Sequence, residues 1–311
     1  MNIQENIDLK LLTYFKIGGK AKYLAEVKNE QELQDAITFT KTKKIPFIVF
    51  GATSNVLVSD RGYNGLIIRM QIRDINRDGD SLTVGAGVPN AIAVSCALKE
   101  CLAGLEWAAG IPGTIGGSVR GNAGCFSGDM SDVVEKVRYL NTESGKIEEG
   151  DNEFCKFAYR ESIFKTSPHF IITSVRLRLR HDTSGLGQRM VRHYTSIRTD
   201  TQDIGMSSAG CAFKNVLWPS SEARRKRLLT ILPQVAEFST RETIPVGFLI
   251  DQLGLKGRAI GKVSISKKHG NYLINNGGAT AEEVIMLIGL IKEYVHRKYD
   301  LQLEEEIQYV G

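Results

Sequence analysis

The sequence has 311 residues, which exceeds the size of one ordinary hydrophobic core and predicts two or three domains. Its hydrophobic content of 42% and its charged content of 24% are typical of a folded, soluble protein. The formal net charge of +5 is compatible with anionic small molecules and with nucleic acid, so charge alone selects no partner.

The N-terminus and the cysteines carry the targeting and redox signals of the chain. The first residues, MNIQENIDLK, are polar and include no apolar run, so we expect no secretory signal. No stretch approaches roughly 18 consecutive apolar residues, so we expect no membrane insertion. The five cysteines include no C-x-x-C pair and histidine is scarce near them. This usage predicts a reduced, cytoplasmic protein without a disulfide framework or a metal site.

In the first two thirds of the chain, hydrophobic periodicity predicts one early helix followed mainly by strands. The helix is expected at 30–43, the strands at 46–50, 56–59, 66–70, 133–140 and 170–179, and a strand-to-helix passage from Ser81 to a helix beginning near Asn90. Residues 104–128 are dense in glycine, which predicts a wrapped loop whose amides contact a ligand. The polar segment 181–203 is interpreted as a boundary between domains.

The last third alternates helix and strand. We expect a basic amphipathic helix at 219–238, a helix at 245–253 with proline at its start, and strands at 263–265, 272–274 and 301–310. Thr280 and Glu283 have the spacing of a capping box, and the apolar residues that follow have a helical period. A long C-terminal helix is therefore predicted from this point.

Two short glycine turns follow predicted strands. The turn GATSN consists of Gly51, Ala52, Thr53, Ser54 and Asn55, and its free amides suit a diphosphate, although an ordinary tight turn fits this pentapeptide equally well. The turn GAGVPN, residues 85–90, lacks the third glycine of a dinucleotide fingerprint and is interpreted as a strand-end turn. No phosphate-binding G-x-x-x-x-G-K-[ST] loop occurs, which argues against a nucleotide triphosphatase.

The segment GIPGTIGGSVRGNAG, residues 110–124, is the most specific local motif. Pro112 fixes one φ angle while Gly113, Gly116 and Gly117 allow others, which predicts a rigid loop able to lie against a planar ring. We also expect a positive φ at Gly117, where a β-branched residue would be disfavoured. A glycine-rich crossover between domains is the structural alternative.

Three further motifs carry reactive or charged side chains. In YRESIF, Arg160 is either a solvated surface residue or a guanidinium fork for a carboxylate or phosphate. In SSAGCAFKN, Cys211 is either a small buried hydrophobe or, with Lys214 nearby, an ionisable proton donor. In LEEEIQ, strand alternation would direct Glu305 to one face and Glu304 and Glu306 to the other, unless the run is only a solvated edge.

Taken in order, these segments closely resemble the MurB family of UDP-N-acetylenolpyruvoylglucosamine reductases. The matching stretches are residues 13–24, 50–60, 104–124, 157–165, 208–215, 249–257, 267–284 and 301–311. They extend over nearly the whole chain and keep their order, which a chance match to a single motif would not do.

The resemblance implies an α+β fold with an N-terminal lead at 1–16, an FAD-binding unit of the para-cresol methylhydroxylase type at 17–180 and a substrate-binding domain at 200–311. The resemblance also implies that FAD binds without a covalent link, and the sequence agrees in one respect, because no histidine precedes His169. The length is that of the shorter subtype of the family. The implied flavin contacts are Gly51, Ala52, Thr53, Ser54, Asn55, Ile111, Pro112, Gly113, Thr114, Gly116, Gly117, Asn122 and Gly124.

The resemblance also implies a mechanism in which NADPH reduces FAD and hydride then passes to a UDP-linked enolpyruvyl amino sugar. Arg160 would stabilise the developing enolate, Glu306 would lie beside the carboxylate, and Cys211 would donate the proton. Familiar members have serine at the proton-donor position. Tyr159, Lys214 and Asn215 would contact the substrate, and no nucleic-acid partner is expected.

Some residues depart from the family pattern. Val216 and Glu305 each stand where proline is usual, and the flavin loop differs at Arg120, Cys125 and Phe126. Two other functions stay open at this point. One is a different flavin oxidoreductase of the same fold, and the other is a flavin- or sugar-nucleotide-binding protein without catalytic activity.

Overall fold

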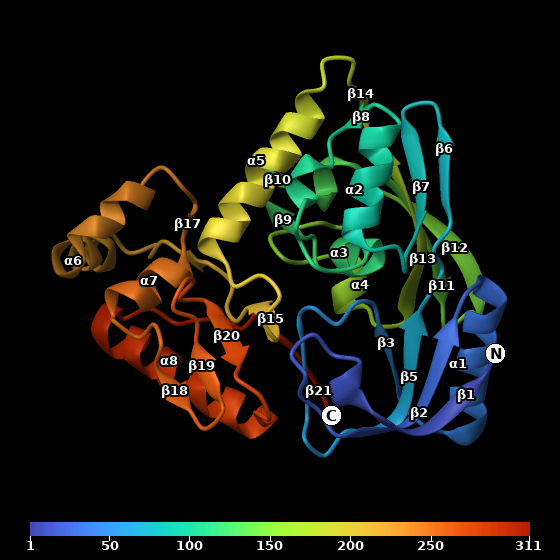
Figure 1. Cartoon of the computed structure of the whole chain (residues 1–311), viewed down its shortest axis with the longest axis horizontal. Helices are drawn as coiled ribbons and strands as arrows, with labels where there is room; N and C mark the ends of the chain where they lie inside the picture. The colour runs from blue at the N-terminus through green and yellow to red at the C-terminus, as the bar shows by residue number, and fades with distance from the viewer. The chain divides into compact units, whose positions relative to one another are not determined.

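The computed structural model describes residues 1–311 and divides the chain into two compact units that interleave in sequence (Figure 1). The first unit comprises residues 1–7, 20–53 and 63–200, and the second comprises 8–19, 54–62 and 201–311. Both units mix helices and strands, in agreement with the predicted α+β class. The predicted domain limits were linear in sequence, whereas two short early segments belong to the second compact unit.

The first unit contains two main β-sheets. A four-stranded sheet has the order β1-β2-β5-β3, and a five-stranded sheet has the order β12-β11-β13-β7-β6. The strands of this unit are β1 (Ile3–Asp8), β2 (Lys20–Val27), β3 (Phe47–Phe50), β5 (Tyr63–Met70), β6 (Ile75–Asp78), β7 (Ser81–Gly85), β8 (Leu102–Ala103), β9 (Gly124–Cys125), β10 (Gly128–Asp129), β11 (Val134–Asn141), β12 (Lys146–Asp151), β13 (Phe170–Arg178) and β14 (Arg180–His181). Strands β2 and β3 both run parallel to β5, whereas the five-stranded sheet is antiparallel.

The helices of the first unit are α1 (Glu30–Lys43), α2 (Asn90–Lys99), α3 (Ile115–Arg120), α4 (Ile163–Thr166) and α5 (Leu186–Thr201), with 3₁₀ turns η2 (Glu106–Ala108) and η3 (Met130–Asp132). Helix α1 has the predicted bounds. Asn29 caps it by accepting the amide of Glu32 at 2.8 Å, and it ends where Lys44 takes a left-handed conformation.

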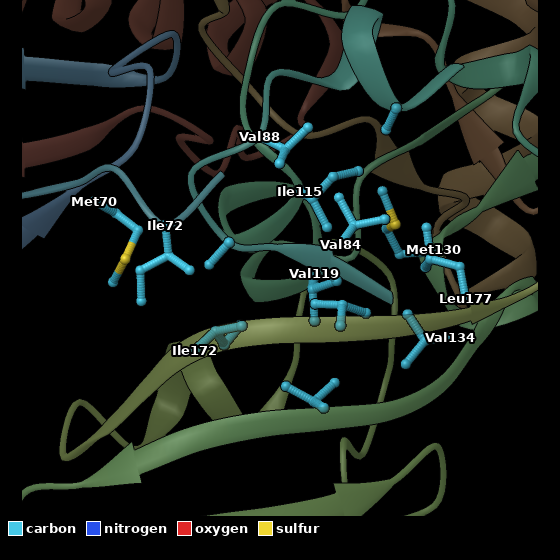
Figure 2. Close-up of a cluster of buried hydrophobic side chains, with 14 of the residues drawn as sticks. Met70, Ile72, Val84, Val88, Ile115, Val119, Met130, Val134, Ile172 and Leu177 are labelled. Carbon is cyan, nitrogen blue, oxygen red and sulfur yellow. The ribbon is translucent and has the colours of Figure 1, made fainter. Parts of the chain in front are cut away.

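The glycine-rich segment 104–128 is not the continuous loop that its composition predicted. It contains η2, α3 and the paired strands β9 and β10. Figure 2 shows Ile115 and Val119, which lie one helical turn apart on α3, among side chains that include Val84 of β7 and Ile172 of β13. Burial of these two side chains explains why a helix forms despite the unfavourable glycine content.

The division between the two compact units falls inside the polar segment 181–203, after Asp200, as predicted, but most of this segment forms helix α5. Met190, Val191, Tyr194 and Ile197 have the spacing of one helical face, and Val191 and Tyr194 pack against the core of the first unit. The helix itself was not predicted, because the overall polarity of the segment concealed this helical period.

The second unit is built around a four-stranded sheet of order β15-β20-β19-β18 and the helix α8. Its elements are η1 (Leu9–Leu11), β4 (Val56–Val58), β15 (Ser208–Cys211), β16 (Val216–Leu217), α6 (Glu222–Ile231), η4 (Pro233–Phe238), β17 (Thr243–Ile244), α7 (Val246–Gln252), β18 (Ala259–Ile260), β19 (Val263–Ile265), β20 (Tyr272–Asn275), α8 (Ala281–Tyr299) and β21 (Gln308–Val310). Leu287, Ile291 and Val295 of α8 form part of the buried core.

Helix termini in the second unit follow the local sequence. Thr280 and Glu283 form the predicted capping box, and the carboxylate of Asp60 adds a second cap by accepting the amide of Ala281 at 2.9 Å. The single helix predicted over 219–238 is instead divided into α6 and η4. Pro233 begins η4, because proline cannot donate the hydrogen bond that would continue α6.

The predicted strand at 301–310 is limited to β21, which pairs in parallel with β4. Upstream, Phe213 and Glu305 form an isolated antiparallel bridge. The chain therefore changes pairing partner within this segment, which interrupts a continuous strand. None of the helices combines the length and the apolar composition needed to cross a bilayer.

Candidate active site

The turn 51–55 follows β3, and its first residue requires glycine for steric reasons. A Cβ atom on Gly51 would lie 2.4 Å from Oγ1 of Thr114, the residue that caps α3. Ala52 is half-buried and Thr53 is buried, with a φ of 58° at Thr53. This part of the turn therefore packs closely against the start of the glycine-rich helix, although the two are far apart in sequence.

Backbone hydrogen bonds join the glycine-rich loop to the turn at 85–90. The amide of Ile115 donates to Val88 O at 2.9 Å, and the amide of Gly116 donates to Ala86 O at 3.0 Å. The side chain of Asn90 strengthens this junction, because it accepts the hydroxyl of Ser118 at 3.0 Å. The strand-end turn predicted at 85–90 is thus the platform on which the loop lies, a role that the sequence did not reveal.

Gly116 and Gly117 are neighbours with opposite steric requirements. A Cβ on Gly116 would lie 2.7 Å from Cβ of Ala86, whereas a Cβ on Gly117 would meet only Oγ1 of Thr114, at 3.5 Å. Gly117 has a helical conformation inside α3 and not the positive φ that was predicted. That prediction was wrong, because it treated the segment as a loop.

The exposed face of this region consists largely of backbone. Gly117 and Pro112 are exposed, Ile111 and Gly113 are half-buried, and the space next to Gly117 is open. A flat ring can approach such a surface with few side chains in its way, and the adjoining turn begins with the small residues Gly51 and Ala52, which a diphosphate site favours. The residues predicted to hold FAD therefore fit a planar cofactor that carries a diphosphate.

The end of the loop holds Arg160. Its guanidinium donates to Gly124 O at 2.9 Å and to Asn122 O at 3.4 Å. The side chain of Asn122 in turn donates to Ala158 O at 3.1 Å, and the hydroxyl of Ser162 donates to Arg120 O at 2.7 Å. The structure thus brings the YRESIF motif and the glycine-rich loop together, with Arg160 half-buried at their junction.

Tyr159 and Arg160 form the tip of a two-residue turn. Reciprocal backbone hydrogen bonds between Ala158 and Glu161 close this turn, and Arg160 has a φ of 58°. A left-handed conformation is disfavoured for a residue other than glycine by about 1 kcal/mol or more. The guanidinium stacks over the Tyr159 ring at 5.2 Å, and Lys165 donates to the carbonyl of Arg160 at 2.8 Å. Stored strain with several supporting contacts is typical of a functional residue.

Helix α5 adds an aromatic contact to the loop that the sequence did not predict. The rings of Tyr194 and Phe126 stack with centroids 4.2 Å apart, and Arg198 lies over Phe126 at 5.1 Å. Gly110 is packed tightly against the same arginine, since an added Cβ would lie 2.8 Å from its Cδ. Phe126 is one of the residues that depart from the family pattern, and this stack gives it a structural role.

In the second unit, Cys211 lies at the end of β15 opposite Tyr272 of β20. The adjacent Ala212 accepts the amide of Glu306 at 2.9 Å. Cys211 and Glu306 are both half-buried. The backbone thus brings together the predicted proton donor and the predicted carboxylate from opposite ends of the second unit's sequence.

Asn271 is a second feature that the sequence did not reveal. Its side chain accepts the amide of Phe213 at 3.0 Å and donates to the carbonyl of the same residue at 2.8 Å. Its own carbonyl accepts the amide of Ala212 at 2.8 Å. The buried carboxamide of Asn271 therefore forms hydrogen bonds with both the N–H and the C=O group of Phe213, as the backbone of a neighbouring strand would.

The other residues predicted to bind substrate have protein partners as well. Lys214 is buried and forms an ion pair with Glu304. Asn215 accepts the amide of Val246 at the start of α7, at 3.3 Å. The structure places both residues directly after the Cys211 strand, so their backbone positions are fixed together with that of Cys211.

Glu305 and Glu306 have clearly different surroundings. Burial alone would raise the pKa of Glu305, but hydrogen bonds from Lys292, at 2.8 Å, and from Tyr309 lower it below its ordinary value. These partners, with Leu303 and Ile307, line a surface cavity of about 650 Å³. Glu305 is therefore committed to an ion pair with Lys292.

Two family models match the chain, one in each half. Residues 21–151 match an FAD binding domain, and residues 202–310 match the C-terminal domain of UDP-N-acetylenolpyruvoylglucosamine reductase. These matches agree with the predicted FAD-binding region and with the predicted C-terminal domain type.

Complete relatives extend the match over the whole chain. The UDP-N-acetylenolpyruvoylglucosamine reductase of Caldicellulosiruptor bescii is 36% identical, covering 97% of this chain and 89% of its own length. That of Bacillus velezensis is 33% identical, covering 96% and 91%. The crystal structure of the enzyme from Thermus caldophilus is 31% identical and covers 100% of both chains with a TM-score of 0.80. The chain therefore belongs to the UDP-N-acetylenolpyruvoylglucosamine reductase family and contains its FAD-binding domain.

Proposed function

We propose that the protein reduces UDP-N-acetylenolpyruvoylglucosamine to UDP-N-acetylmuramate, a step in the synthesis of peptidoglycan precursors. NADPH is the proposed source of electrons, and the cytoplasm is the proposed location. FAD, when bound, would supply the hydride that the methylene carbon of the enolpyruvyl group accepts. The residues of this chain then have three tasks: to stabilise negative charge, to hold the substrate carboxylate and to deliver one proton.

Arg160 is proposed to stabilise the negative charge that develops on the substrate. Hydride addition at the methylene carbon moves electron density to the neighbouring carbon and its carboxylate. A fixed guanidinium lowers the energy of that enolate most when it needs no reorganisation. The hydrogen bonds from Arg160 to Asn122 and Gly124 support this proposal, because they restrict the side chain before substrate binds.

Cys211 is proposed to donate the proton that completes the reduction. A thiol has a pKa of about 8.5 in water and is far more acidic than the hydroxyl of serine, so a cysteine at this position can act as a general acid. Glu306 is proposed to interact with the substrate carboxylate. The single observation that carries this assignment is the hydrogen bond from the amide of Glu306 to Ala212, the residue next to Cys211.

The remaining contacts are proposed by the same reasoning. Residues 51–54 and the predicted flavin contacts within the segment 111–124 are proposed to bind FAD, and Tyr159, Lys214 and Asn215 are proposed to contact the sugar nucleotide. The proposed domain limits remain 17–180 and 200–311. No nucleic-acid partner is part of this proposal.

A coupled assay tests the function directly. Purified protein is supplied with FAD, NADPH and the enolpyruvyl sugar nucleotide, and NADPH oxidation is followed together with the mass of the product. We expect one NADPH to be consumed for each UDP-N-acetylmuramate formed. Flavin reduction without product would instead indicate another flavin oxidoreductase of this fold. Binding of both ligands without NADPH oxidation would indicate a protein without catalytic activity.

A further inference from the structure

Asn55 was predicted to contact the flavin, but its side chain is directed to another part of the chain. Its Nδ2 donates to the backbone carbonyl of Glu306 at 2.9 Å. The backbone carbonyl of Asn55 accepts the amide of Gln308 at 3.0 Å. This bond lies next to the first residue pair of the parallel ladder between β4 and β21. Asn55 therefore binds the chain on both sides of Ile307.

These contacts complete the hydrogen bonding of the Glu306 backbone. The amide of Glu306 donates to Ala212 at 2.9 Å, and its carbonyl accepts both Asn55 and the side chain of Gln308, the latter at 3.1 Å. A residue with both backbone groups bonded has little freedom in φ and ψ, so its side chain can sample only its own rotamers. The backbone position from which the Glu306 side chain extends is thereby fixed relative to the strand that ends at Cys211.

The chemical identity of Asn55 suits this task. A carboxamide N–H is a neutral donor that a carbonyl accepts without bringing another charge near Glu306. Aspartate has nearly the same shape but would direct a carboxylate oxygen at the carbonyl of Glu306, and alanine would remove the donor. Thr53, two residues earlier, belongs to the first compact unit, whereas Asn55 belongs to the second.

We propose that Asn55 is a positioning residue for the reduction, acting through the backbone of Glu306 to keep that carboxylate aligned with Cys211. This inference rests on the proposed function. It changes the role of one residue in the 51–55 turn from cofactor contact to alignment of the proton-transfer region.

A double-mutant cycle tests the proposal by comparing the wild type, Asn55→Ala, Glu306→Gln and the double variant. We expect Asn55→Ala to lower kcat by about tenfold at saturating FAD, with little further loss when it is added to Glu306→Gln. FAD affinity and the rate of flavin reduction by NADPH should stay unchanged, because neither involves Glu306. Asn55→Asp should reproduce the kcat defect with a side chain of matched shape.

Asn276→Ala is the matched control, because this exposed asparagine donates to Ser264 at 3.0 Å on a different segment. It should leave kcat unchanged. Multiplicative losses in the cycle, or weaker FAD binding with normal kcat at saturating FAD, would overturn the proposal.

Hydrogen exchange tests the proposal by a measurement that does not depend on activity. The amides of residues 306–308 should exchange faster in Asn55→Ala than in Asn276→Ala, and equal exchange would overturn the positioning contact. If the wild type does not convert the enolpyruvyl substrate, the proposed function fails, and this measurement still decides whether Asn55 holds Glu306.

Discussion

The glycine-rich segment of the first unit and the Cys211 strand of the second unit are held in opposite ways. Around α3, backbone packs directly on backbone, and Gly116 approaches Ala86 where no side-chain atom fits. Around Cys211, side-chain amides and ion pairs hold the backbone, with Asn271 bonded to Phe213 and Lys214 paired with Glu304.

This difference determines which changes each region tolerates. Where backbone packs on backbone, an added atom is damaging. Where carboxamides and charges hold a strand, the loss of a donor is damaging because it leaves a buried partner unsatisfied. The following variants test this contrast, from the largest expected effect to the smallest.

Cys211→Ala should have the largest effect. It should lower the rate of substrate reduction without weakening the binding of FAD. We expect turnover to fall by about 10³-fold, the typical contribution of a general acid. FAD binding and its reduction by NADPH should persist, because the substitution removes atoms and adds none. Stopped-flow absorbance separates the two half-reactions, and equal turnover in the variant would remove Cys211 from the mechanism.

Gly116→Val should be the most damaging change in the backbone-packed region. The added Cβ meets Ala86 at 2.7 Å, and overpacking of this kind costs about 1–3 kcal/mol. Thermal unfolding and FAD titration measure the loss of stability and of cofactor occupancy. An unchanged unfolding temperature with full FAD occupancy would contradict the packing argument.

Gly117→Ala is the matched control one residue away. Its Cβ would have only Thr114 Oγ1 nearby, at 3.5 Å, and alanine is favoured over glycine in a helix by up to about 1 kcal/mol. We expect unchanged or slightly higher thermal stability. Because a cofactor would approach this exposed position, FAD affinity is measured separately, and a fall in affinity without a fall in stability would locate the flavin there.

Cys211→Ser should have an intermediate effect. A hydroxyl keeps the size and the donor but is a much weaker acid, so turnover should lie between that of the wild type and that of Cys211→Ala. Inactivation by alkylating reagents should disappear. The readout is activity and not labelling, because Cys101 is exposed and will react in every variant. Unchanged inactivation would assign the sensitive thiol to another cysteine.

Lys292→Met should have a small effect on stability, and this effect should depend on pH. Glu305 has a pKa below its ordinary value of 4.5, so its ionised form stabilises the fold above that value, and the benefit is lost as pH falls through the lowered pKa. Lys292 is substantially exposed, so we expect a difference of about 0.5–1 kcal/mol at pH 7 between wild type and variant. Urea unfolding should show this difference shrinking as the pH falls below 4.5, and a difference independent of pH would exclude the ion pair as its cause.

Local sequence signals predicted the elements whose hydrogen bonds are local. Helix α1 and the capping box at Thr280 are confirmed because their caps lie within a few residues. Helices α3 and α5 were missed, because burial in the core outweighs the glycine content of one and the polarity of the other. Membership of the family was confirmed, and its motifs lie along nearly the whole chain.

The arrangement of the candidate site was only partly predictable. The motif residues Arg160, Cys211 and Glu306 were identified from the sequence, and their chemical roles remain proposals. The contacts of Asn55 and Asn271 were not foreseen, because each side chain bonds backbone from a distant segment and leaves no periodic signal. In sequence, an asparagine at the end of a turn is equally compatible with a ligand contact and with a hydrogen bond to the backbone of a distant segment.

Anaerobic reoxidation of the flavin tests the central claim most directly. Purified protein is incubated with FAD, reduced with NADPH and mixed with UDP-N-acetylenolpyruvoylglucosamine while visible absorbance is followed. We predict that the absorbance of oxidised flavin returns rapidly in the wild type and far more slowly in Cys211→Ala. A protein that stays colourless with excess FAD, or a reduced flavin that persists in the presence of this substrate, would contradict the account.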